Sequence, residues 1–471
     1  MVFSSLLFLL WFLPLFFVCY FLSPHRFKNF ILLVFSIIFY AWGEPKYISL
    51  LLISSVVDYI NGRCLEKCEG RRNRQKIFLV ISIVVNLSLL GIFKYMTLFI
   101  TTINGVFGAG IKEPKLALPL GISFFTFQTM SYSIDVYRGK IKPEHNFINY
   151  MAYVSMFPQL VAGPIVRYEE IMIQLKSKRR FNLENFENGA ERFLFGLFKK
   201  VLVANQVGSL WDKVLEMGDR SVLMAWLGLV AFTFRIYFDF SGYSDMAVGM
   251  GRIMGFSYPE NFNYPYISKS ITEFWRRWHM TLSGWFRDYV YIPLGGNRKG
   301  KGRQILNIAI VWALTGFWHG ASWNYLLWGL YFGVILTVEK LATGGLLMKA
   351  PALVSRIYSL ILIMLGWMIF AVEDIKELGT YAVQTFGFKA TCFVDKAFLF
   401  QLRNYAAILV VATIFSTPIY PAIIKKIEGS ESAGVKNLFA LVKMTVMCLL
   451  VTVCISMLVA DSYNPFLYFR F

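Results

Sequence analysis

The sequence predicts an all-α protein that crosses a membrane many times, with about ten or eleven transmembrane or re-entrant helices. Of its 471 residues, 57% are hydrophobic and 16% are charged, whereas charged residues make up about a quarter of an ordinary soluble domain. The apolar residues form long continuous blocks and not the alternating strands of a membrane β-barrel. We expect one integral membrane domain over 1–471, with N-terminal spans in 1–115, a motif-bearing core in 116–340 and C-terminal spans in 341–471.

The net charge of +19 reflects basic residues that gather in loops between the apolar blocks, at 61–76, 167–200 and 298–303. Such loops are typical of the cytoplasmic side of a membrane protein, where they also meet anionic lipid. We therefore interpret the basic stretches as cytoplasmic loops that contact membrane lipids, and we expect no nucleic-acid binding. The first block, residues 1–25, has no basic n-region and no cleavage site, so we interpret it as a retained span.

The apolar segment 145–166 is expected to be re-entrant. If the loops at 61–76 and 167–200 both face the cytoplasm, an even number of crossings must separate them, yet three apolar segments lie between. Within 145–166, Pro158 and Pro164 would break a helix. Broken backbone at membrane depth is tolerated only where protein or a water-filled cavity satisfies it, so we expect the chain to enclose a cavity.

A second break is expected in 304–338, which is 35 residues without a charge. As one helix it would be about 52 Å long, against a hydrocarbon core of about 30 Å. Gly316 and Gly320 bracket the expected place, and a straight helix from the turn at 298–303 would carry His319 roughly 24 Å along, past the midplane. A buried histidine is often a hydrogen-bonded core residue, but an ionisable group within a span is a functional candidate. The sequence leaves both interpretations open.

The segment 272–289 carries a second histidine. Trp275, His279 and Ser283 recur every four residues, so we expect them to share one helix face. The segment is either an interfacial amphipathic helix with its arginines on lipid phosphates, or the cytoplasmic lip of a site that admits an anionic donor. The arginines available to bind such a donor are Arg276, Arg277 and Arg287.

Three further charged residues lie in the apolar segment 232–245. Arg235 and Asp239 are four residues apart, and we expect them to neutralise one another on a helix. Asp245 has no local basic partner and is the better candidate for positioning another group.

Several chemistries lack their motifs. The sequence contains no G-x-S-x-G, S-x-x-K or H-E-x-x-H pattern and no complete dinucleotide fingerprint. The lysine loop at 295–302 ends on Gly302, where a phosphate loop needs Ser or Thr, and Cys64 and Cys68 have no second pair to complete a zinc site. We expect no metal and no bound cofactor.

Six segments carry a resemblance to a known family: Phe157–Ile165, Asp239–Asp245, Asn261–Tyr266, Phe274–Ile292, Pro293–Gly300 and Phe317–Asn324. Together they resemble the membrane-bound O-acyltransferase superfamily, and within it the bacterial branch that O-acetylates alginate and other cell-surface polysaccharides. The resemblance covers most of the chain and is densest over about 120–340.

The resemblance implies a ring of helices around a central funnel in the bacterial cytoplasmic membrane. It implies that His319 is the catalytic histidine and His279 the second characteristic one. An acetyl group from a cytoplasmic donor, expected to be acetyl-coenzyme A, would pass to an extracytoplasmic acceptor. We expect the acceptor to be a polysaccharide, reached directly or through a separate SGNH-type transferase.

Acyl transfer from a thioester needs a general base and an oxyanion donor, and we expect the residues near the two histidines to supply them. A neutral imidazole at His319 can take the proton from an acceptor hydroxyl as that oxygen attacks a thioester, an effect worth typically 10²–10⁴-fold. His279 would orient the donor or shuttle a proton. The oxyanion needs a donor, either Asn324 or backbone N–H groups at the helix break, with Trp318 and Asp245 as further supporting candidates.

The C-terminal aromatics 463–471 are either an interfacial anchor or a relay. Their Phe-x-Tyr-x-x-Phe spacing resembles the tail of the small partner protein in teichoic-acid D-alanylation systems, so Tyr468 would hold the acyl group transiently.

Two other functions stay open. One is D-alanyl transfer to teichoic acid, although the turn at 293–298 looks more like the acetylating branch. The other is a transporter of lipid or polymer, which would need no Trp-His-Gly histidine and for which we see no inverted repeat.

Overall fold

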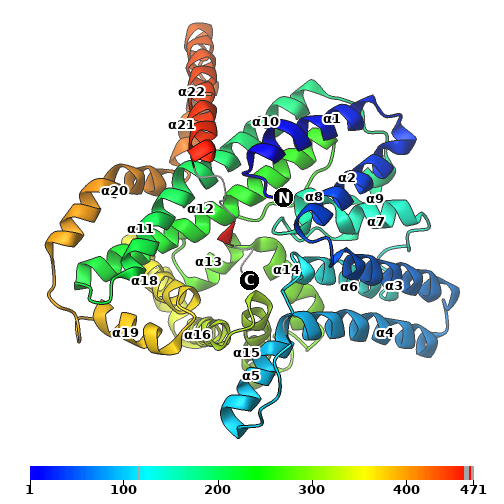
Figure 1. The fold of residues 1–471 in the computed structure, drawn as a ribbon, viewed down its shortest axis with the longest axis horizontal. Coiled ribbons are helices and arrows are strands. Elements are labelled where there is room, and N and C mark those ends of the chain that lie inside the picture. Colours follow the sequence, from blue (N-terminus) through cyan, green and yellow to red (C-terminus); the bar gives the residue numbers. More distant parts are fainter. Residues whose placement is uncertain (115, 461–465, 468–471) are drawn as a thin grey trace. The chain divides into compact units, whose positions relative to one another are not determined.

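The computed structural model describes residues 1–114, 116–460 and 466–467, and the regular structure in these ranges is helical (Figure 1). The predicted all-α, multi-pass fold is confirmed, because nine helical segments among the described residues are long and apolar enough to cross a membrane. A shorter apolar helix covers Phe8–Leu22. The nine segments are His25–Gly43, Ile48–Lys67, Arg72–Phe107, Leu183–Glu216, Val222–Met254, Trp323–Leu347, Ala352–Ala371, Lys396–Phe415 and Ala433–Ala460.

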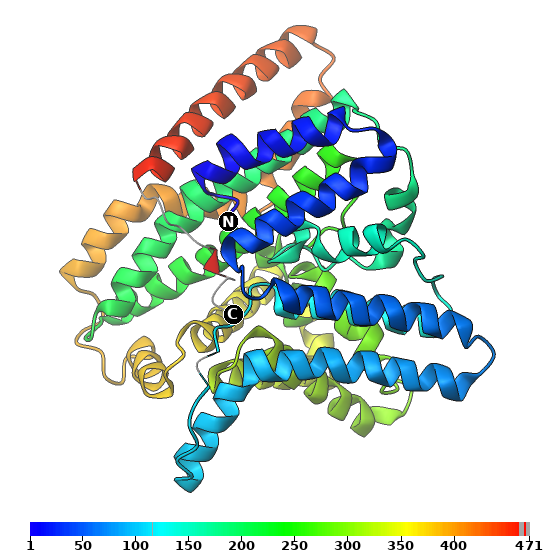
Figure 2. The ribbon, with the colours of Figure 1, turned by 45° about the vertical axis from the view of Figure 1, so that its right-hand side comes forward.

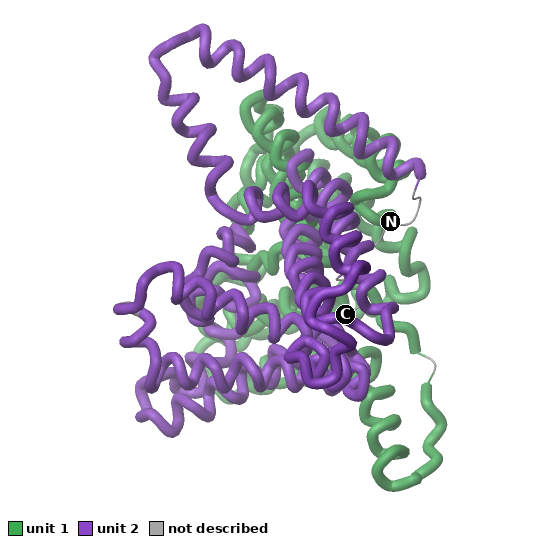
Figure 3. Tube along the Cα trace, turned by 90° about the vertical axis from the view of Figure 1, so that its left-hand side faces the viewer, with its two compact units in different colours: residues 1–193, 243–259, 468–471 green, residues 194–242, 260–467 purple. Residues whose placement is uncertain are grey.

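The chain divides into two compact units, coloured separately in Figure 3. The first contains residues 1–193 and 243–259. In this unit α1 lies beside α2, and α3 lies beside α4 (Figure 2). Its helices are η1 (Phe8–Phe12), α1 (Leu13–Leu22), η2 (His25–Phe27), α2 (Lys28–Gly43), α3 (Ile48–Lys67), α4 (Arg72–Leu90), η3 (Gly91–Tyr95), α5 (Met96–Phe107), α6 (Ile122–Tyr137), α7 (Phe147–Ser155), α8 (Phe157–Leu160), α9 (Tyr168–Lys176) and most of α10 (Leu183–Phe198).

The segment 145–166 is broken, as the sequence predicts. α7 ends at Ser155, the four-residue α8 follows Met156, and residues 161–167 form no helix. At 1.5 Å per residue α7 is about 14 Å long, half of a hydrocarbon core. Residues 150–166 are buried in protein, and Ser36 Oγ accepts a hydrogen bond from the N–H of Phe157 at 3.1 Å. Protein thus satisfies backbone at the break, which is the condition for such a break at membrane depth.

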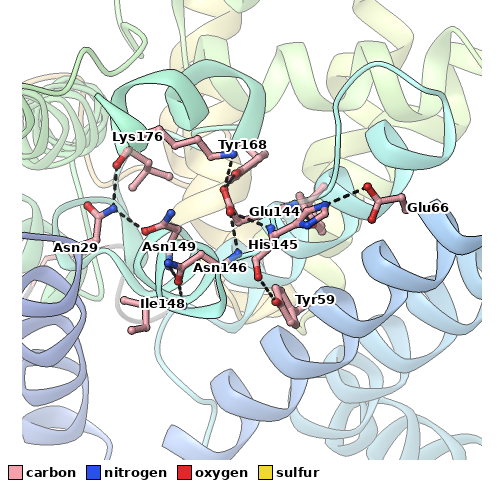
Figure 4. Close-up of polar contacts among 12 residues, drawn as sticks. Asn29, Tyr59, Glu66, Glu144, His145, Asn146, Ile148, Asn149, Tyr168 and Lys176 are labelled. Atoms are coloured by element: carbon pink, nitrogen blue, oxygen red, sulfur yellow. Dashed lines mark hydrogen bonds and ion pairs between the residues drawn. The ribbon is translucent and has the colours of Figure 1, made fainter. Parts of the chain in front are cut away.

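Glu144 holds the chain on both sides of this broken segment (Figure 4). Its carboxylate, 2% exposed, accepts hydrogen bonds from the N–H groups of His145 and Asn146 at 2.9 Å and from the hydroxyl of Tyr168. It also pairs with Lys176 Nζ at 3.0 Å. One buried carboxylate therefore ties the start of α7 to both ends of α9.

The second unit contains residues 194–242 and 260–467. α12 (Val222–Met254) begins in it and ends in the first unit. Its other helices are η4 (Lys199–Ala204), α11 (Asn205–Glu216), η5 (Pro265–Ile267), α13 (Ile271–Arg277), α14 (Met280–Phe286), η6 (Arg287–Tyr291), α15 (Gly300–His319), α16 (Trp323–Val338), η7 (Glu339–Thr343), α17 (Gly344–Lys349), α18 (Ala352–Ala371), α19 (Ile375–Thr385), α20 (Lys396–Phe415), α21 (Ile419–Glu428) and α22 (Ala433–Ala460).

The predicted break in 304–338 is confirmed at residues 320–322, and it turns α15 and α16 into an antiparallel hairpin. A Cβ atom on Gly316 would lie 2.3 Å from the carbonyl oxygen of Tyr325, and one on Gly320 would lie 2.2 Å from the Tyr325 ring. Glycine at these positions lets the two helices approach until their backbones touch. Gly316 itself stays within α15, so the break lies just beyond His319.

Candidate active site

His319 is the last residue of α15 and lies at the tip of this hairpin. Only 3% of the residue is exposed. Three aromatic rings meet the imidazole nearly edge to face: Trp318 at 5.0 Å, Trp328 at 4.9 Å and Phe370 at 5.4 Å between centroids. The rings come from α15, α16 and α18, so side chains of three helices enclose this imidazole.

His279 lies between two helices, at a helix break that the sequence interpretation missed. The expected continuous helix with Trp275, His279 and Ser283 on one face is wrong, because α13 ends at Arg277 and α14 begins at Met280. His279 has φ +44°, a left-handed conformation that costs roughly 1–2 kcal/mol for a residue with a Cβ. The flanking backbone holds the break, since the N–H of Met280 donates to the carbonyl of Asn261 at 3.0 Å.

Asn261 orients the His279 ring. Its Oδ1 lies 3.0 Å from His279 Nδ1 and accepts hydrogen bonds from the Thr281 N–H at 3.4 Å and hydroxyl at 2.9 Å. The backbone N–H of Thr281 can only donate, which identifies the Asn261 atom as the oxygen. Nδ1 of His279 therefore carries the proton and Nε2 carries the lone pair. His279 lies outside the nine candidate spans, and burial lowers its pKa to about 3, so the ring is neutral at physiological pH.

Trp318 connects the two histidines. Its ring centroid lies 5.8 Å from that of His279 and 5.0 Å from that of His319. Phe240 of α12 meets the His279 ring at 4.7 Å and at 90°. The structure thus brings together His279, His319 and Trp318, three of the predicted site residues, within one unit. These three residues form what we call the histidine site.

Asn324 is fully buried beside this site, but its amide is already engaged. Nδ2 donates to the carbonyls of Ile369 and Phe370, both at 3.2 Å. An oxyanion donor needs a free N–H, and both N–H groups of Asn324 have carbonyl partners, so its role in oxyanion stabilisation stays a prediction that this arrangement does not favour. The side chain instead anchors α16 to the end of α18, next to the Phe370 ring that contacts His319.

Trp328 offers a donor that sequence reasoning missed. The residue is fully buried, its ring lies against His319, and its Nε1 has no hydrogen-bond acceptor among the described residues. A buried N–H without an acceptor costs about 1–3 kcal/mol, which a bound polar group would recover. Tryptophan spacing gave no signal for this, because the property depends on what surrounds the indole.

The predicted pairing of Arg235 with Asp239 is wrong. Arg235 Nη1 lies 2.6 Å from Asp212 Oδ1 on α11, and Asp239 Oδ1 lies 2.6 Å from Lys200 Nζ on η4. Helical spacing places Arg235 and Asp239 on one face of α12, but each side chain forms its ion pair with an oppositely charged residue on a neighbouring helix.

Asp245 also has an ion-pair partner on another helix. Arg192 of α10 pairs with it, with Nη2 2.9 Å and Nε 3.1 Å from Asp245 Oδ1. Both residues belong to the first unit. Asp245 has no local basic partner, as the sequence shows, and its partner lies 53 residues away along the chain.

The three arginines proposed to bind a donor differ in their surroundings. Arg277 pairs with Glu273 at 2.9 Å, and Arg287 pairs with its neighbour Asp288 at 2.8 Å. Arg276 is exposed. Donor binding by these residues stays a prediction, as does acyl relay by Tyr468, which lies outside the described residues.

Glu339 positions the helix that leads to His279. It is 3% exposed, and its carboxylate accepts the N–H groups of Ile271 at 2.7 Å and Thr272 at 2.8 Å, together with the Thr272 hydroxyl at 2.7 Å. A carboxylate at a helix N-terminus satisfies donors that have no partner within the helix and complements the helix dipole. No sequence pattern indicates this contact, since Glu339 is 68 residues away from the helix it caps.

Comparison with known proteins gives a family match over the part of the chain that contains this site. The model of the membrane-bound O-acyltransferase family matches residues 92–372, a range that includes both histidines. The chain is 36% identical to the probable alginate O-acetylase of Azotobacter vinelandii over 100% of both chains. It is 32% identical to the peptidoglycan O-acetyltransferase of Helicobacter pylori, over 100% of this chain and 98% of that one. A teichoic acid D-alanyltransferase of Bacillus subtilis is 31% identical over 46% of this chain and 58% of its own length.

Proposed function

The chain belongs to the membrane-bound O-acyltransferase family, and from this membership we propose that it moves an acetyl group from a cytoplasmic thioester donor across the membrane for O-acetylation of an exported or cell-surface polysaccharide. The chain is an acyltransferase and a multi-pass membrane protein. The donor, the catalytic base and the direction of transfer are parts of the proposal. We place the protein in the bacterial cytoplasmic membrane, with acetyl-coenzyme A as donor substrate.

One observation carries the catalytic part of the proposal. His319 is a buried imidazole at the tip of a helix hairpin, and Trp318 links it to a second, neutral histidine. In the proposed step His319 takes the proton of an acceptor hydroxyl while the oxygen attacks the thioester carbonyl. The new C–O bond forms, the C–S bond breaks, and the thiolate leaves as the free thiol once the imidazolium returns the proton.

His279 acts beside the base in this proposal. Asn261 accepts the hydrogen bond from Nδ1, so Nε2 is the ring atom of His279 that can accept a proton. The oxyanion is assigned to the Trp328 indole N–H or to backbone N–H groups at residues 320–322, because the amide of Asn324 is engaged by α18.

The acceptor route is also part of the proposal. The acetyl group reaches the polysaccharide directly or through an extracytoplasmic SGNH-type transferase, and Tyr468 would carry it on the way if a relay operates. The phenol oxygen would form the ester as the thiol leaves, and the acceptor hydroxyl would then displace the phenol.

D-Alanyl transfer to teichoic acid is the remaining alternative, since teichoic acid D-alanyltransferases match part of the chain. The acetylating relatives match all of it, which favours acetyl. The transporter alternative does not agree with the family, because its members are acyltransferases.

Purified protein in vesicles separates these alternatives. With radiolabelled acetyl-coenzyme A and an oligosaccharide acceptor we expect a labelled O-acetyl ester, and with a D-alanyl thioester we expect none. His319→Ala should abolish the ester, while His145→Ala, at an exposed histidine of the first unit, should leave it unchanged. D-alanyl ester without acetyl ester would overturn the choice of acyl group, and an active His319→Ala protein would overturn the base.

A further inference from the structure

A buried ion pair lies in the second unit, between η4 and α12. Lys200 Nζ is 2.6 Å from Asp239 Oδ1, and the two side chains are 3% and 4% exposed. Two charges removed from water are costly unless hydrogen bonds satisfy their remaining donors and acceptors. The second carboxylate oxygen of Asp239 therefore needs a donor of its own.

Residues 466 and 467 contact the two members of this pair. The backbone N–H of Leu467 donates to Asp239 Oδ2 at 2.7 Å. Lys200 Nζ lies 4.7 Å from the centroid of the Phe466 ring, within cation–π range. Phe466 is 1% exposed and Leu467 is 9% exposed, so these two residues are packed into protein.

The burial of Phe466 does not fit an interfacial anchor at this position. An interfacial anchor presents its rings to the headgroup region of the bilayer. The Phe466 ring instead covers a buried ammonium group. Residues 466 and 467 are thus bound by the protein, and the bound groups are one ring and one backbone N–H.

The same turn of α12 also touches the histidine site. Asp239 binds the N–H of Leu467, and the next residue, Phe240, meets the His279 ring at 4.7 Å. Successive residues on a helix point about 100° apart, so one turn of α12 can hold the C-terminal residues on one side and His279 on another.

From these contacts we infer that the Lys200–Asp239 pair is an intramolecular docking site for residues 466 and 467, and that this docking is required for efficient acyl transfer at the histidine site. Lys200 and Asp239 are positioning residues and not catalytic ones. Docking itself is independent of the proposed function, whereas its role in transfer rests on it.

The backbone hydrogen bond gives a sharp test. Leu467→Pro removes the N–H that Asp239 accepts, and Leu467→Ala keeps it while shortening the side chain. Both are made in the full-length protein with p-benzoylphenylalanine in place of Phe466. After irradiation we expect crosslinks to peptides that contain Lys200 or Asp239, retained in Leu467→Ala and reduced at least tenfold in Leu467→Pro.

Acyl transfer is measured with the same two variants, without the photoreactive group. We expect Leu467→Pro to lower kcat at least tenfold while the KM for acetyl-coenzyme A stays unchanged, and Leu467→Ala to stay within twofold of wild type. Detergent extraction yield and elution profile check that both variants fold.

Each outcome has one meaning. Absence of the crosslink, or a crosslink that survives Leu467→Pro, would overturn docking. A lost crosslink with unchanged kcat would overturn the positioning role. A crosslink that behaves as expected in a protein that transfers no acetyl group would overturn the proposed function and leave docking intact.

Discussion

The Nδ1 atom of His279 lies 3.0 Å from Oδ1 of Asn261. This contact joins the segment before η5 to the left-handed residue between α13 and α14. The amide oxygen also accepts from the Thr281 hydroxyl. A single side chain thus sets the orientation and the tautomer of the His279 ring and also contacts the first turn of α14.

Asn261→Ala should lower acyl transfer by about tenfold to a hundredfold, because losing a buried hydrogen-bond partner costs about 1–3 kcal/mol. The effect should appear in kcat, measured with labelled acetyl-coenzyme A. Asn263→Ala is the matched control, since Asn263 is exposed and contributes backbone contacts to Arg277. Equal activity of both variants would show that Asn261 does not orient His279.

Acidification should destabilise the protein through His279. Burial lowers its pKa in the folded state to about 3, so the neutral form is favoured by folding. The stability this contributes is complete above the unfolded-state pKa of about 6.5 and is lost as the pH falls toward 3. Between pH 7.5 and 5 the loss should be about 2 kcal/mol in wild type and absent in His279→Asn.

Denaturant unfolding at the two pH values measures this difference, and His145→Asn, at an exposed histidine, should behave like wild type. If wild type and His279→Asn lost the same stability, His279 would not titrate as its burial predicts.

Glu339→Gln should destabilise the protein by about 1–3 kcal/mol, because α13 loses the charged acceptor of its first N–H groups. Since α13 leads to His279, acyl transfer should fall as well. Glu428→Gln, at the exposed end of α21, should change neither quantity. The measurements are urea unfolding in detergent and the rate of acetyl transfer. A stable, fully active Glu339→Gln protein would remove this residue from the positioning of the site.

Trp328→Phe removes the indole N–H and keeps an aromatic ring, so it tests the effect of the N–H alone. If this N–H stabilises the oxyanion, kcat should fall about 10²–10³-fold with little change in KM, the usual effect of removing one such donor. Asn324→Leu should instead lower stability with a smaller effect on kcat, because its amide binds α18. The reverse ranking in steady-state kinetics would return the oxyanion role to Asn324.

Much of the fold follows from the sequence, because the thickness of a bilayer limits the length of an uncharged helix. The 35 uncharged residues of 304–338 cannot remain one helix, and their break occurs next to His319. In the same way, Pro158 and Pro164 make an unbroken 145–166 segment unfavourable.

Pairing between distant segments does not follow in this way. Helical periodicity predicted Arg235 with Asp239 and one helix through His279, and both predictions fail. Asp212, Lys200 and the carbonyl of Asn261 are far away in the sequence and compete successfully for these groups. Glu339 and Trp328 matter through their neighbours, which only the folded chain defines.

Single-turnover transfer by purified His319→Gln tests the central claim most directly. Wild type and variant are each loaded with acetyl-coenzyme A and mixed with acceptor, and the ester is followed in time while donor binding is measured separately. A general base predicts a rate 10²–10⁴-fold slower in the variant with donor affinity unchanged. A rate within twofold of wild type would contradict it.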